Sequence, residues 1–306
     1  MKKIYFLGAS LIFLSNAAYS QDQLPLNPTQ SLIYVNPSFA GSNGSLRDQY
    51  VNNYLFPNFP TNNVIYYNGL DGYVKKLRGG LALSGMINDY AQGTYRESEL
   101  NLIYAPVFEC EESGIKVIPS IQISYIQRAI DYSKMTFGQG FIMLNPNGAP
   151  MQKKENFDAS AGLLFNYKNL YAGASLFHIN QPDVGLAGAS KLPNRLSLNA
   201  SYSIPLNQKT LLNFSTVYTR QQNFSTFQLA ANAIFFRHII AGLGFQANDV
   251  VFGNLGYRNN FFSATGGYNV GYSKLSGNQS GSWQLAIAFS LHKKEKGQAP
   301  LSFEKW

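Results

Sequence analysis

The ten residues Arg195-Leu-Ser-Leu-Asn-Ala-Ser-Tyr-Ser-Ile204 alternate without a fault between apolar and polar side chains, once Arg195 is counted with the polar set. Successive side chains of a β-strand point to opposite faces, so this stretch predicts a strand with one apolar face and one polar face. In a soluble β-sandwich the apolar face would pack against a core. In an outer-membrane barrel it would face lipid, and the serines would face a polar lumen. The rest of the chain has to decide between these two folds.

Segments of this kind recur about every twenty residues and are bounded by Gly, Asn, Pro, Ser or Lys, which is typical of a transmembrane barrel. Helical periodicity is missing nearly everywhere, and no run of eighteen apolar residues follows the first twenty residues. We therefore predict an all-β fold, a transmembrane antiparallel β-barrel of about 14 strands, an even number as in bacterial barrels. The predicted strands are 47–53, 62–71, 79–89, 96–107, 114–128, 158–167, 170–179, 195–205, 209–219, 225–236, 238–247, 249–257, 260–272 and 281–291.

The connections and the basic residues support this count. The longest connections, at 129–157, 180–194 and 273–280, all fall on one side of the predicted barrel, and the turns on the other side are short. Lys and Arg fall at segment ends or in turns, where they avoid the cost of about 2 to 4 kcal/mol for a base that faces lipid at the midplane. A soluble sandwich would tolerate such bases in mid-strand.

The composition agrees with a surface covered by lipid. Charged residues are 13% of the chain and aromatic residues 14%, whereas an average soluble domain carries about 25% charged residues. The formal net charge of +8 could suggest nucleic acid, but the bases are scattered singly and the chain begins with an export signal, so we expect no nucleic acid as partner. Cys110 is the one cysteine, which excludes an intramolecular disulfide.

Residues 1–20 have the three parts of a removable signal peptide: Lys2 and Lys3, an apolar stretch, and Ala18-Tyr19-Ser20 before the cleavage point. The mature chain then divides into an N-terminal periplasmic or lumenal segment (21–46), the outer-membrane barrel (47–291) and a periplasmic tail (292–306). An even number of strands predicts that both termini are periplasmic.

Shortly after Gln21-Asp22 the mature chain carries Asn36-Pro37-Ser38-Phe39-Ala40-Gly41-Ser42, just before the first predicted strand. This resembles the Asn-Pro-Ala-Tyr-Ala-Gly-Ser element that opens mature proteins of the PorP/SprF family, type IX secretion-associated outer-membrane proteins of Bacteroidetes. The resemblance continues through Gly79-Gly-Leu-Ala-Leu83, the loop at 89–93 and the final strand Trp283-Gln-Leu-Ala-Ile-Ala-Phe289. The residues of the family motif are Asn36, Pro37, Phe39, Ala40, Gly41 and Ser42.

The resemblance implies a barrel that helps a type IX cargo to reach or stay on the cell surface, and a link to gliding motility. The implied cargo is a secreted adhesin with a type IX C-terminal domain, and the implied further partners are periplasmic type IX lipoproteins, beside outer-membrane lipid. The residues themselves leave a second function open, a passive outer-membrane porin or small-solute transporter that uses the polar lumen.

Two segments have alternative interpretations. Asn36 to Ser42 is either ordinary turn chemistry that starts the first strand, or part of a segment, 21–46, that folds back against or into the barrel, because fourteen strands enclose more room than their own side chains fill. The loop 129–157 carries an apolar run that is either an exposed contact surface or an inward plug. Its candidate partner-binding residues are Phe137, Phe141, Ile142, Met143 and Leu144.

We expect no catalysis, cofactor or metal. His178, His238 and His292 lie at segment ends, and none has the serine two positions further on that would resemble an outer-membrane phospholipase. We interpret them as histidines at the membrane interface or the rim. The sequence has no HExxH motif, no Cys/His cluster and no Gly-rich strand-to-helix loop.

Overall fold

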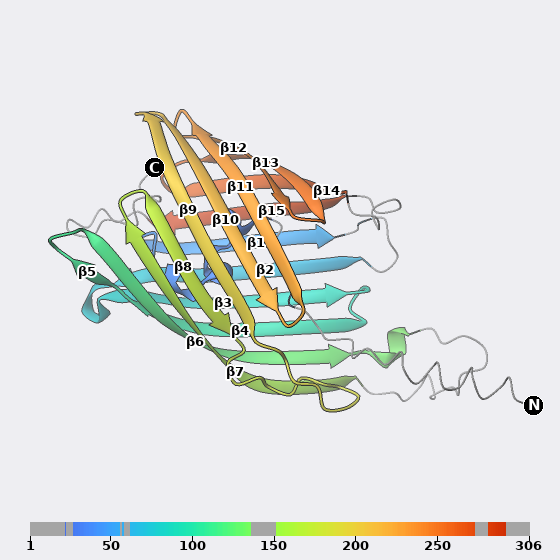
Figure 1. The fold of residues 1–306 in the computed structure, drawn as a ribbon. Coiled ribbons are helices and arrows are strands. Elements are labelled where there is room, and N and C mark those ends of the chain that lie inside the picture. Colours follow the sequence, from blue (N-terminus) through green and yellow to red (C-terminus); the bar gives the residue numbers. More distant parts are fainter. Residues whose placement is uncertain are drawn as a thin grey trace, which may run out of the picture.

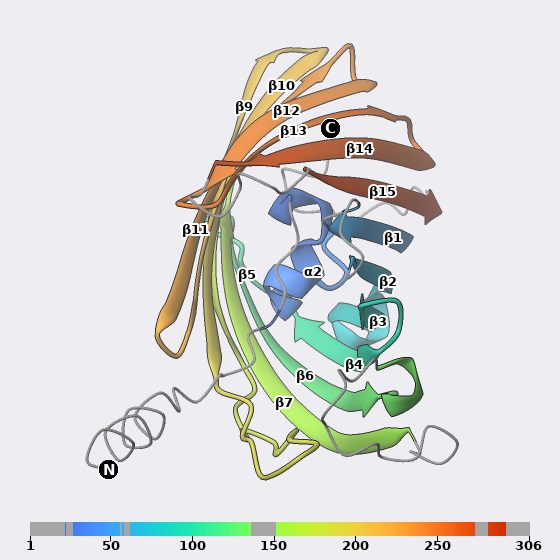
Figure 2. The same cartoon turned by 90° about the vertical axis from the view of Figure 1, so that its right-hand side faces the viewer.

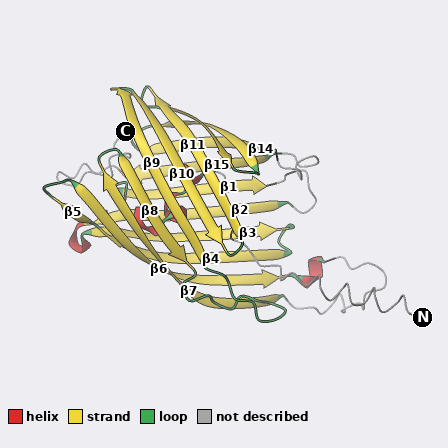
Figure 3. Ribbon diagram, in the orientation of Figure 1, coloured by secondary structure: helices red, strands yellow, loops and turns green. Residues whose placement is uncertain are grey.

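The computed structural model describes residues 22, 27–55, 57, 62–135, 151–272 and 281–291. These residues form one antiparallel sheet that curls round on itself (Figure 1 and Figure 3). Neighbouring strands pair in chain order, β1 pairs with β15, and β4 pairs with β6. Closure pairs the edges that an open sheet would expose.

The strand bounds follow the predicted segments closely. The strands are β1 Leu46–Leu55, β2 Asn63–Val74, β3 Gly79–Tyr90, β4 Tyr95–Pro106, β5 Phe108–Cys110, β6 Ile115–Ile130, β7 Gln152–Tyr167, β8 Leu170–Phe177, β9 Arg195–Asn207, β10 Thr210–Gln221, β11 Phe224–Phe235, β12 Ile239–Gln246, β13 Val250–Arg258, β14 Phe262–Gly271 and β15 Ser282–Leu291. Strands β4 and β5 flank Val107 and both pair with β6, so they are one interrupted strand of the wall. The predicted closed, antiparallel, all-β barrel of fourteen strands is confirmed.

Strand β9 shows how the alternating sequence is used. Arg195, Ser197, Asn199, Ser201 and Ser203 are buried toward the lumen. The intervening apolar side chains point outward, and those of Leu196, Leu198 and Tyr202 are exposed. The polar face of the strand is thus the inner face of the barrel, as expected when lipid covers the outside.

Strand β7 corrects one prediction. It begins at Gln152 rather than at residue 158, and β6 continues to Ile130, so the connection between them covers 131–151 instead of 129–157. Residues 152–156 are polar at every position and carry no apolar alternation, which hid the strand from a search for hydrophobic periodicity. Pairing with β6 forms it instead, and Gln127 Nε2 donates to Glu155 Oε1 at 2.8 Å across the pair.

A short helical segment lies inside the barrel, where Figure 2 shows α2 enclosed by the strands. It consists of η1 Pro28–Gln30, α2 Leu32–Val35 and η2 Pro37–Phe39. Two further single turns, η3 Lys75–Leu77 and η4 Tyr132–Lys134, lie in connections between strands. None of the helices in the described ranges is long and apolar enough to span a membrane.

The two ends of the barrel differ. The four longest connections, 56–62, 131–151, 178–194 and 272–281, are at one end, which we call the long-connection end. The opposite, short-turn end carries turns such as 168–169 and 208–209. This agrees with the asymmetry predicted from the spacing of the segments.

The first and last described residues lie at opposite ends of the barrel. Leu291 ends β15 at the short-turn end. Asp22 contacts His178, Arg195 and Gln221, which lie where β8, β9 and β10 meet the long-connection end. The prediction that both termini are periplasmic stays a prediction, because residues 1–21 and 292–306 lie outside the described residues.

Candidate functional site

The segment 27–45 fills part of the lumen, and Asn36 is its main anchor. The Asn36 side chain is fully buried, and its Nδ2 donates to the carbonyl oxygens of Leu163 and Ala174 and to Asn199 Oδ1, at 3.2, 3.4 and 3.0 Å. Its Oδ1 accepts from the Ser38 amide at 3.0 Å, which caps η2. One side chain therefore ties the segment to β7, β8 and β9 and also fixes the turn that follows.

Further polar contacts hold the same segment against other strands. Ser38 Oγ and Ser120 Oγ of β6 lie 2.8 Å apart. The Gly41 amide donates to Asp71 Oδ2 of β2 at 2.8 Å, and Arg47 Nε donates to the other carboxylate oxygen at 2.9 Å. Asp71 is thus a buried carboxylate that is paired with a guanidinium and also accepts from the backbone, as a buried charge requires.

Glycines in the wall allow the segment to approach closely. A Cβ on Gly80 would lie 1.9 Å from the Ala40 carbonyl oxygen, and one on Gly162 would lie 2.5 Å from Asn36 Oδ1. A Cβ on Gly173 would lie 2.7 Å from Asn36 Nδ2. Gly41 itself has φ +70, and a Cβ there would lie 2.5 Å from Gly80 Cα. The wall and the segment therefore meet backbone to backbone at Gly80 and Gly41, while Gly162 and Gly173 leave room for the Asn36 side chain.

Phe39 supplies the apolar part of the anchor. Its side chain is completely buried and meets the ring of Tyr171 edge-on, with ring centroids 5.1 Å apart. Around it lies one apolar cluster from the segment and from β3, β4, β6, β7 and β8: Ile33, Ala40, Ala82, Ile103, Ala105, Ile118 and Leu164. This cluster is the hydrophobic core that joins the segment to one side of the barrel wall.

The segment also contacts the opposite part of the wall. The Asn27 amide donates to Gln284 Oε1 of β15 at 3.0 Å, and Asn27 Nδ2 donates to Asn254 Oδ1 of β13 at 3.2 Å. Asn43 Nδ2 donates to Ser290 Oγ of β15 at 3.1 Å. A cavity of about 330 Å³ remains beside the segment and is lined by Thr29, Gln30, Leu32, Asn43 and residues of β10–β15. The segment is therefore hydrogen-bonded around much of the circumference, with a hollow at its side.

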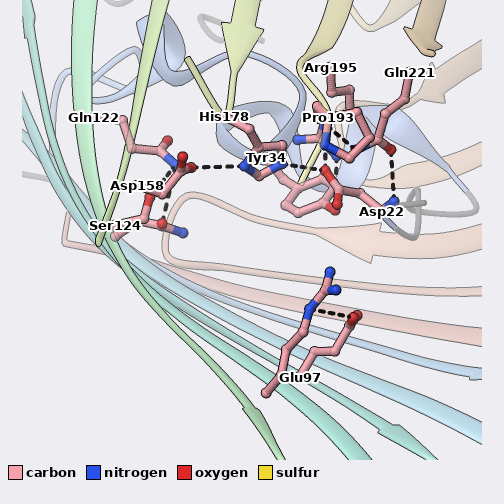
Figure 4. A network of polar contacts seen from close by, with 12 residues as sticks. Asp22, Tyr34, Glu97, Gln122, Ser124, Asp158, His178, Pro193, Arg195 and Gln221 are labelled. Atoms are coloured by element: carbon pink, nitrogen blue, oxygen red, sulfur yellow. Dashed lines mark hydrogen bonds and ion pairs between the residues drawn. The ribbon is translucent and has the colours of Figure 1, made fainter. Parts of the chain in front are cut away.

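Asp22 belongs to a buried group of charges at the long-connection end (Figure 4). His178 Nε2 lies 2.6 Å from Asp22 Oδ2, and His178 Nδ1 lies 2.8 Å from Asp158 Oδ2. Arg195 Nε lies 3.4 Å from the same Asp22 oxygen, and the Asp22 amide donates to Gln221 Oε1 at 2.9 Å. We call Asp22, Asp158, His178 and Arg195 the ion cluster. It joins the N-terminal segment to β7, β9 and the end of β8.

The opposite charges of the ion cluster stabilise one another. Burial alone would lower the pKa of His178, but Asp22 and Asp158 outweigh burial and raise that pKa to about 10. Burial would raise the pKa of Asp22, but His178 and Arg195 outweigh it and hold that pKa well below its ordinary value. At neutral pH the cluster therefore joins an imidazolium and a guanidinium to carboxylates in a buried setting.

Arg195 is further held by aromatic rings. Its guanidinium carbon lies 4.9 Å from the centroid of Tyr34 and 4.1 Å from that of Phe177, and Arg195 NH1 donates to the Tyr34 hydroxyl at 3.1 Å. Tyr34 belongs to α2, so Arg195 connects the ion cluster to the helical segment. The connection 178–194 packs inward beside it, where Val184 and Leu192 meet Ile126 of β6.

These contacts hold the N-terminal segment in place. They leave no free base for catalysis at His178, because each of its ring nitrogens lies within hydrogen-bond distance of a carboxylate. Among the described residues no group of three or more His, Cys, Asp or Glu side chains could hold a metal ion. The geometry fixes a segment of the chain inside the lumen.

The structure brings the residues of the family motif together in this anchor. Asn36, Pro37, Phe39, Ala40, Gly41 and Ser42 are all buried inside the barrel. Phe137, Phe141, Ile142, Met143 and Leu144 lie outside the described residues, as does His292. His238 is exposed at the short-turn end, stacked on Tyr257, in keeping with a rim position.

Sequence reasoning missed the ion cluster. His178 was expected at the interface or the rim but is buried, with 4% of its surface exposed. The signal that could have found the cluster is the placement of Asp158 and Arg195 on the lumenal face of their strands. Charged side chains on that face need partners in the lumen once the lumen is filled.

A closed barrel with a tethered lumenal segment and an apolar outer face defines a plugged β-barrel of the outer-membrane type. A family model described as "Type IX secretion system membrane protein PorP/SprF" matches residues 20–289. The chain therefore belongs to the PorP/SprF family, and the predicted resemblance is confirmed. No curated protein matches the chain. Family and fold are those of a secretion-associated membrane barrel and not of a known enzyme class.

Several solved outer-membrane proteins share the general shape. Omp33 of Acinetobacter baumannii is 8% identical, with a TM-score of 0.48 over 81% of this chain and 98% of that protein. A FadL homologue of Pseudomonas aeruginosa is 10% identical, with a TM-score of 0.46 over 81% and 90%. The toluene transporter TodX of P. putida is 9% identical, with a TM-score of 0.47 over 84% and 92%. At these values the likeness does not extend to function.

Proposed function

We propose that this barrel is a plugged, non-enzymatic outer-membrane protein that supports surface delivery or anchoring of an adhesin-type cargo with a type IX C-terminal domain. Membership of a type IX secretion family supports the secretion role. The observation that carries the proposal is the segment 27–45, which is bonded to β2, β6, β7, β8, β9, β13 and β15 inside the lumen. A lumen filled in this way suits a docking protein better than a solute channel.

The alternative is a passive porin or small-solute transporter. The cavity of about 330 Å³ beside the segment is the feature that favours it. Against it stand the buried anchors Asn36 and Phe39 and the ion cluster, which would all have to release before the lumen opened. We therefore propose that ions or solutes pass only when the segment has left the lumen.

The proposed orientation follows from the connections. Long connections of bacterial barrels face outward and short turns face the periplasm; in the orientation that we propose, Leu291 is on the periplasmic side and Asp22 at the cell surface. In this orientation the connection 131–151, with Phe137, Phe141, Ile142, Met143 and Leu144, is the proposed cargo contact. Periplasmic type IX lipoproteins would meet the short turns, and a role in gliding would follow from the cargo.

Surface proteomics of cells that lack this gene tests the proposal. Complementation with the wild-type gene should keep the adhesin on the cell surface, whereas replacement of residues 138–150 by a short Gly/Ser linker should release it into the medium. Closing a loop over fewer residues costs little, so the variant barrel should still migrate differently when unheated and when boiled. If the deletion strain itself carries the wild-type amount of adhesin on its surface, the secretion role is refuted.

A further inference from the structure

The outer face of β1 and β2 carries polar side chains among apolar ones. Residues of β1 alternate between the lumen, where Val51 and Asn53 are buried, and the outside, where Asp48 is exposed. Asn52 shares the outward parity of Asp48, and Asn68 of β2 is exposed beside buried Tyr67. We call Asp48, Asn52 and Asn68 the polar patch.

The polar patch lies within the apolar part of the outer wall. Asp48 is paired across the sheet with Leu70 and Phe289, and Asn52 is paired with Tyr66 and Leu285. Asn68 is paired with Tyr50 and Gly85. Apolar or aromatic positions therefore surround all three residues, as in the lipid-facing band of a barrel.

Strands β8–β15 differ from β1 and β2 in this respect, and the outward Asp89, Gln127 and Glu155 of β3, β6 and β7 lie toward the long-connection end. On strands β8–β15, all of whose residues the structure describes, no outward position carries a carboxylate or an amide. Typical outward residues there are Leu198, Phe214, Leu243, Leu255 and Leu285. A carboxylate or an amide that faces hydrocarbon loses hydration and costs free energy unless a partner replaces the water.

Contacts within the described chain use only part of the hydrogen-bonding capacity of the patch. Asp48 Oδ1 accepts from Asn68 Nδ2 at 2.9 Å, Asn68 Nδ2 also reaches the Gln49 carbonyl at 3.3 Å, and Asn52 Nδ2 donates to the Ile65 carbonyl at 3.3 Å. Asp48 Oδ2 and the side-chain carbonyl oxygens of both asparagines can still accept. The hydroxyls of the exposed residues Tyr50 and Tyr66, next to them, can donate.

We propose that a second copy of this chain docks on the polar patch and forms a two-fold symmetric dimer in the membrane. Such an interface places the same surface of each subunit against the other and so must be self-complementary. The patch meets this requirement because it offers acceptors on Asp48, Asn52 and Asn68 and donors on the two tyrosines and on Asn52. Lipid acyl chains offer neither.

An apolar hollow adjoins the polar patch and gives a second copy further surface to fill. It measures about 870 Å³, reaches from Asn52 across β15 toward β10, and is open on the outer wall. Trp283, Leu285, Tyr268 and Leu243 line it. A polar centre with an apolar flank fits a protein interface, since hydrogen bonds there set register while apolar contact supplies area.

Cysteine cross-linking in native outer membranes tests the dimer. In a Cys110→Ser background, Asn52→Cys and separately Leu70→Cys should form a disulfide-linked species of twice the chain mass on treatment with a membrane-permeant oxidant. The matched control is Leu198→Cys, an exposed outward position on β9 in a distant part of the wall, which should stay monomeric. A cross-linked species of any other mass, or equal dimer from Leu198→Cys, would overturn the proposal.

Removal of the patch gives the second test. Asp48→Leu, Asn52→Leu and Asn68→Leu combined, with Leu70→Cys as reporter, should abolish the dimer band, because the interface loses its hydrogen bonds. The variant should remain heat-modifiable, since leucine facing lipid does not disturb a closed sheet. A folded triple variant that still gives the wild-type amount of dimer would show that the polar patch is not the interface.

Discussion

Single residues decide how firmly the segment is held in the lumen, and the Asn36 side chain contributes hydrogen bonds to three strands. Asn36→Ala removes donors from the Leu163 and Ala174 carbonyls and leaves Asn199 without its partner in the segment. A buried polar group left unsatisfied costs about 1 to 3 kcal/mol. We expect the amides of 31–42 to exchange hydrogen correspondingly faster, measured by mass spectrometry, while strand amides stay protected.

The control for that experiment is Asn43→Ala. Asn43 bonds Ser45 and Ser290 from a half-buried position near the end of the segment. Its loss should change exchange in 31–42 much less. Equal effects of the two substitutions would mean that Asn36 has no special anchoring role.

His178 makes the attachment of the segment depend on pH. Its pKa is raised from 6.5 to about 10 in the folded protein, so its stabilising contribution is complete below 6.5 and is lost as the pH rises through 10. We expect the thermal unfolding midpoint to fall between pH 7 and 10 in the wild type. His178→Gln should flatten that part of the profile, and His238→Gln, at the exposed rim, should not. A wild-type midpoint that is constant over this range would contradict the charge assignment of the ion cluster.

The residue-level pattern was only partly readable from the sequence. Asn36 to Ser42 could be singled out by resemblance, but turn chemistry and a lumenal position were equally compatible with those residues. His178 could not be placed, because its partners Asp22 and Asp158 are 156 and 20 positions away in the chain. Contacts at such separations depend on the closed barrel and leave no local periodicity.

At the scale of elements, the strands were predictable because lipid on one side and a polar lumen on the other impose period-two alternation. The start of β7 was not, since residues 152–156 are polar on both faces and extend past the apolar band. The path of 27–45 through the lumen was not predictable either, because short helical turns carry no periodicity of their own.

The close contact between Gly80 of β3 and Ala40 of the lumenal segment gives a prediction about how these two elements pack. Gly80→Ala places a Cβ 1.9 Å from the Ala40 carbonyl oxygen, a contact with backbone that only movement of the segment or of β3 can relieve. We expect faster hydrogen exchange in 31–42 with the barrel still heat-modifiable. Gly266→Ala on β14 is the matched control, because nothing lies within 4 Å of its Cβ. Unchanged exchange in Gly80→Ala would mean that the segment does not rest on β3.

For the whole molecule, the positions of Asp22 and Leu291 predict opposite exposure of the two chain ends. An epitope tag placed directly before Asp22 should be accessible to antibody on intact cells, and a tag placed after Trp306 should become accessible only when the outer membrane is permeabilised. Antibody access to the C-terminal tag alone on intact cells would reverse the proposed orientation. Access to neither or to both would exclude the threaded path of the N-terminal segment.

The central claim is that residues 27–45 close the lumen, and ion conductance across planar bilayers measures this directly. A planar bilayer that contains the purified wild-type barrel should carry a current at or near that of a protein-free bilayer. A variant that lacks residues 27–42 but keeps the approach to β1 should produce stable open-channel currents, because fourteen strands without a plug enclose a water-filled passage. Large, steady currents through the wild-type protein, equal to those of the deletion variant, would contradict the account.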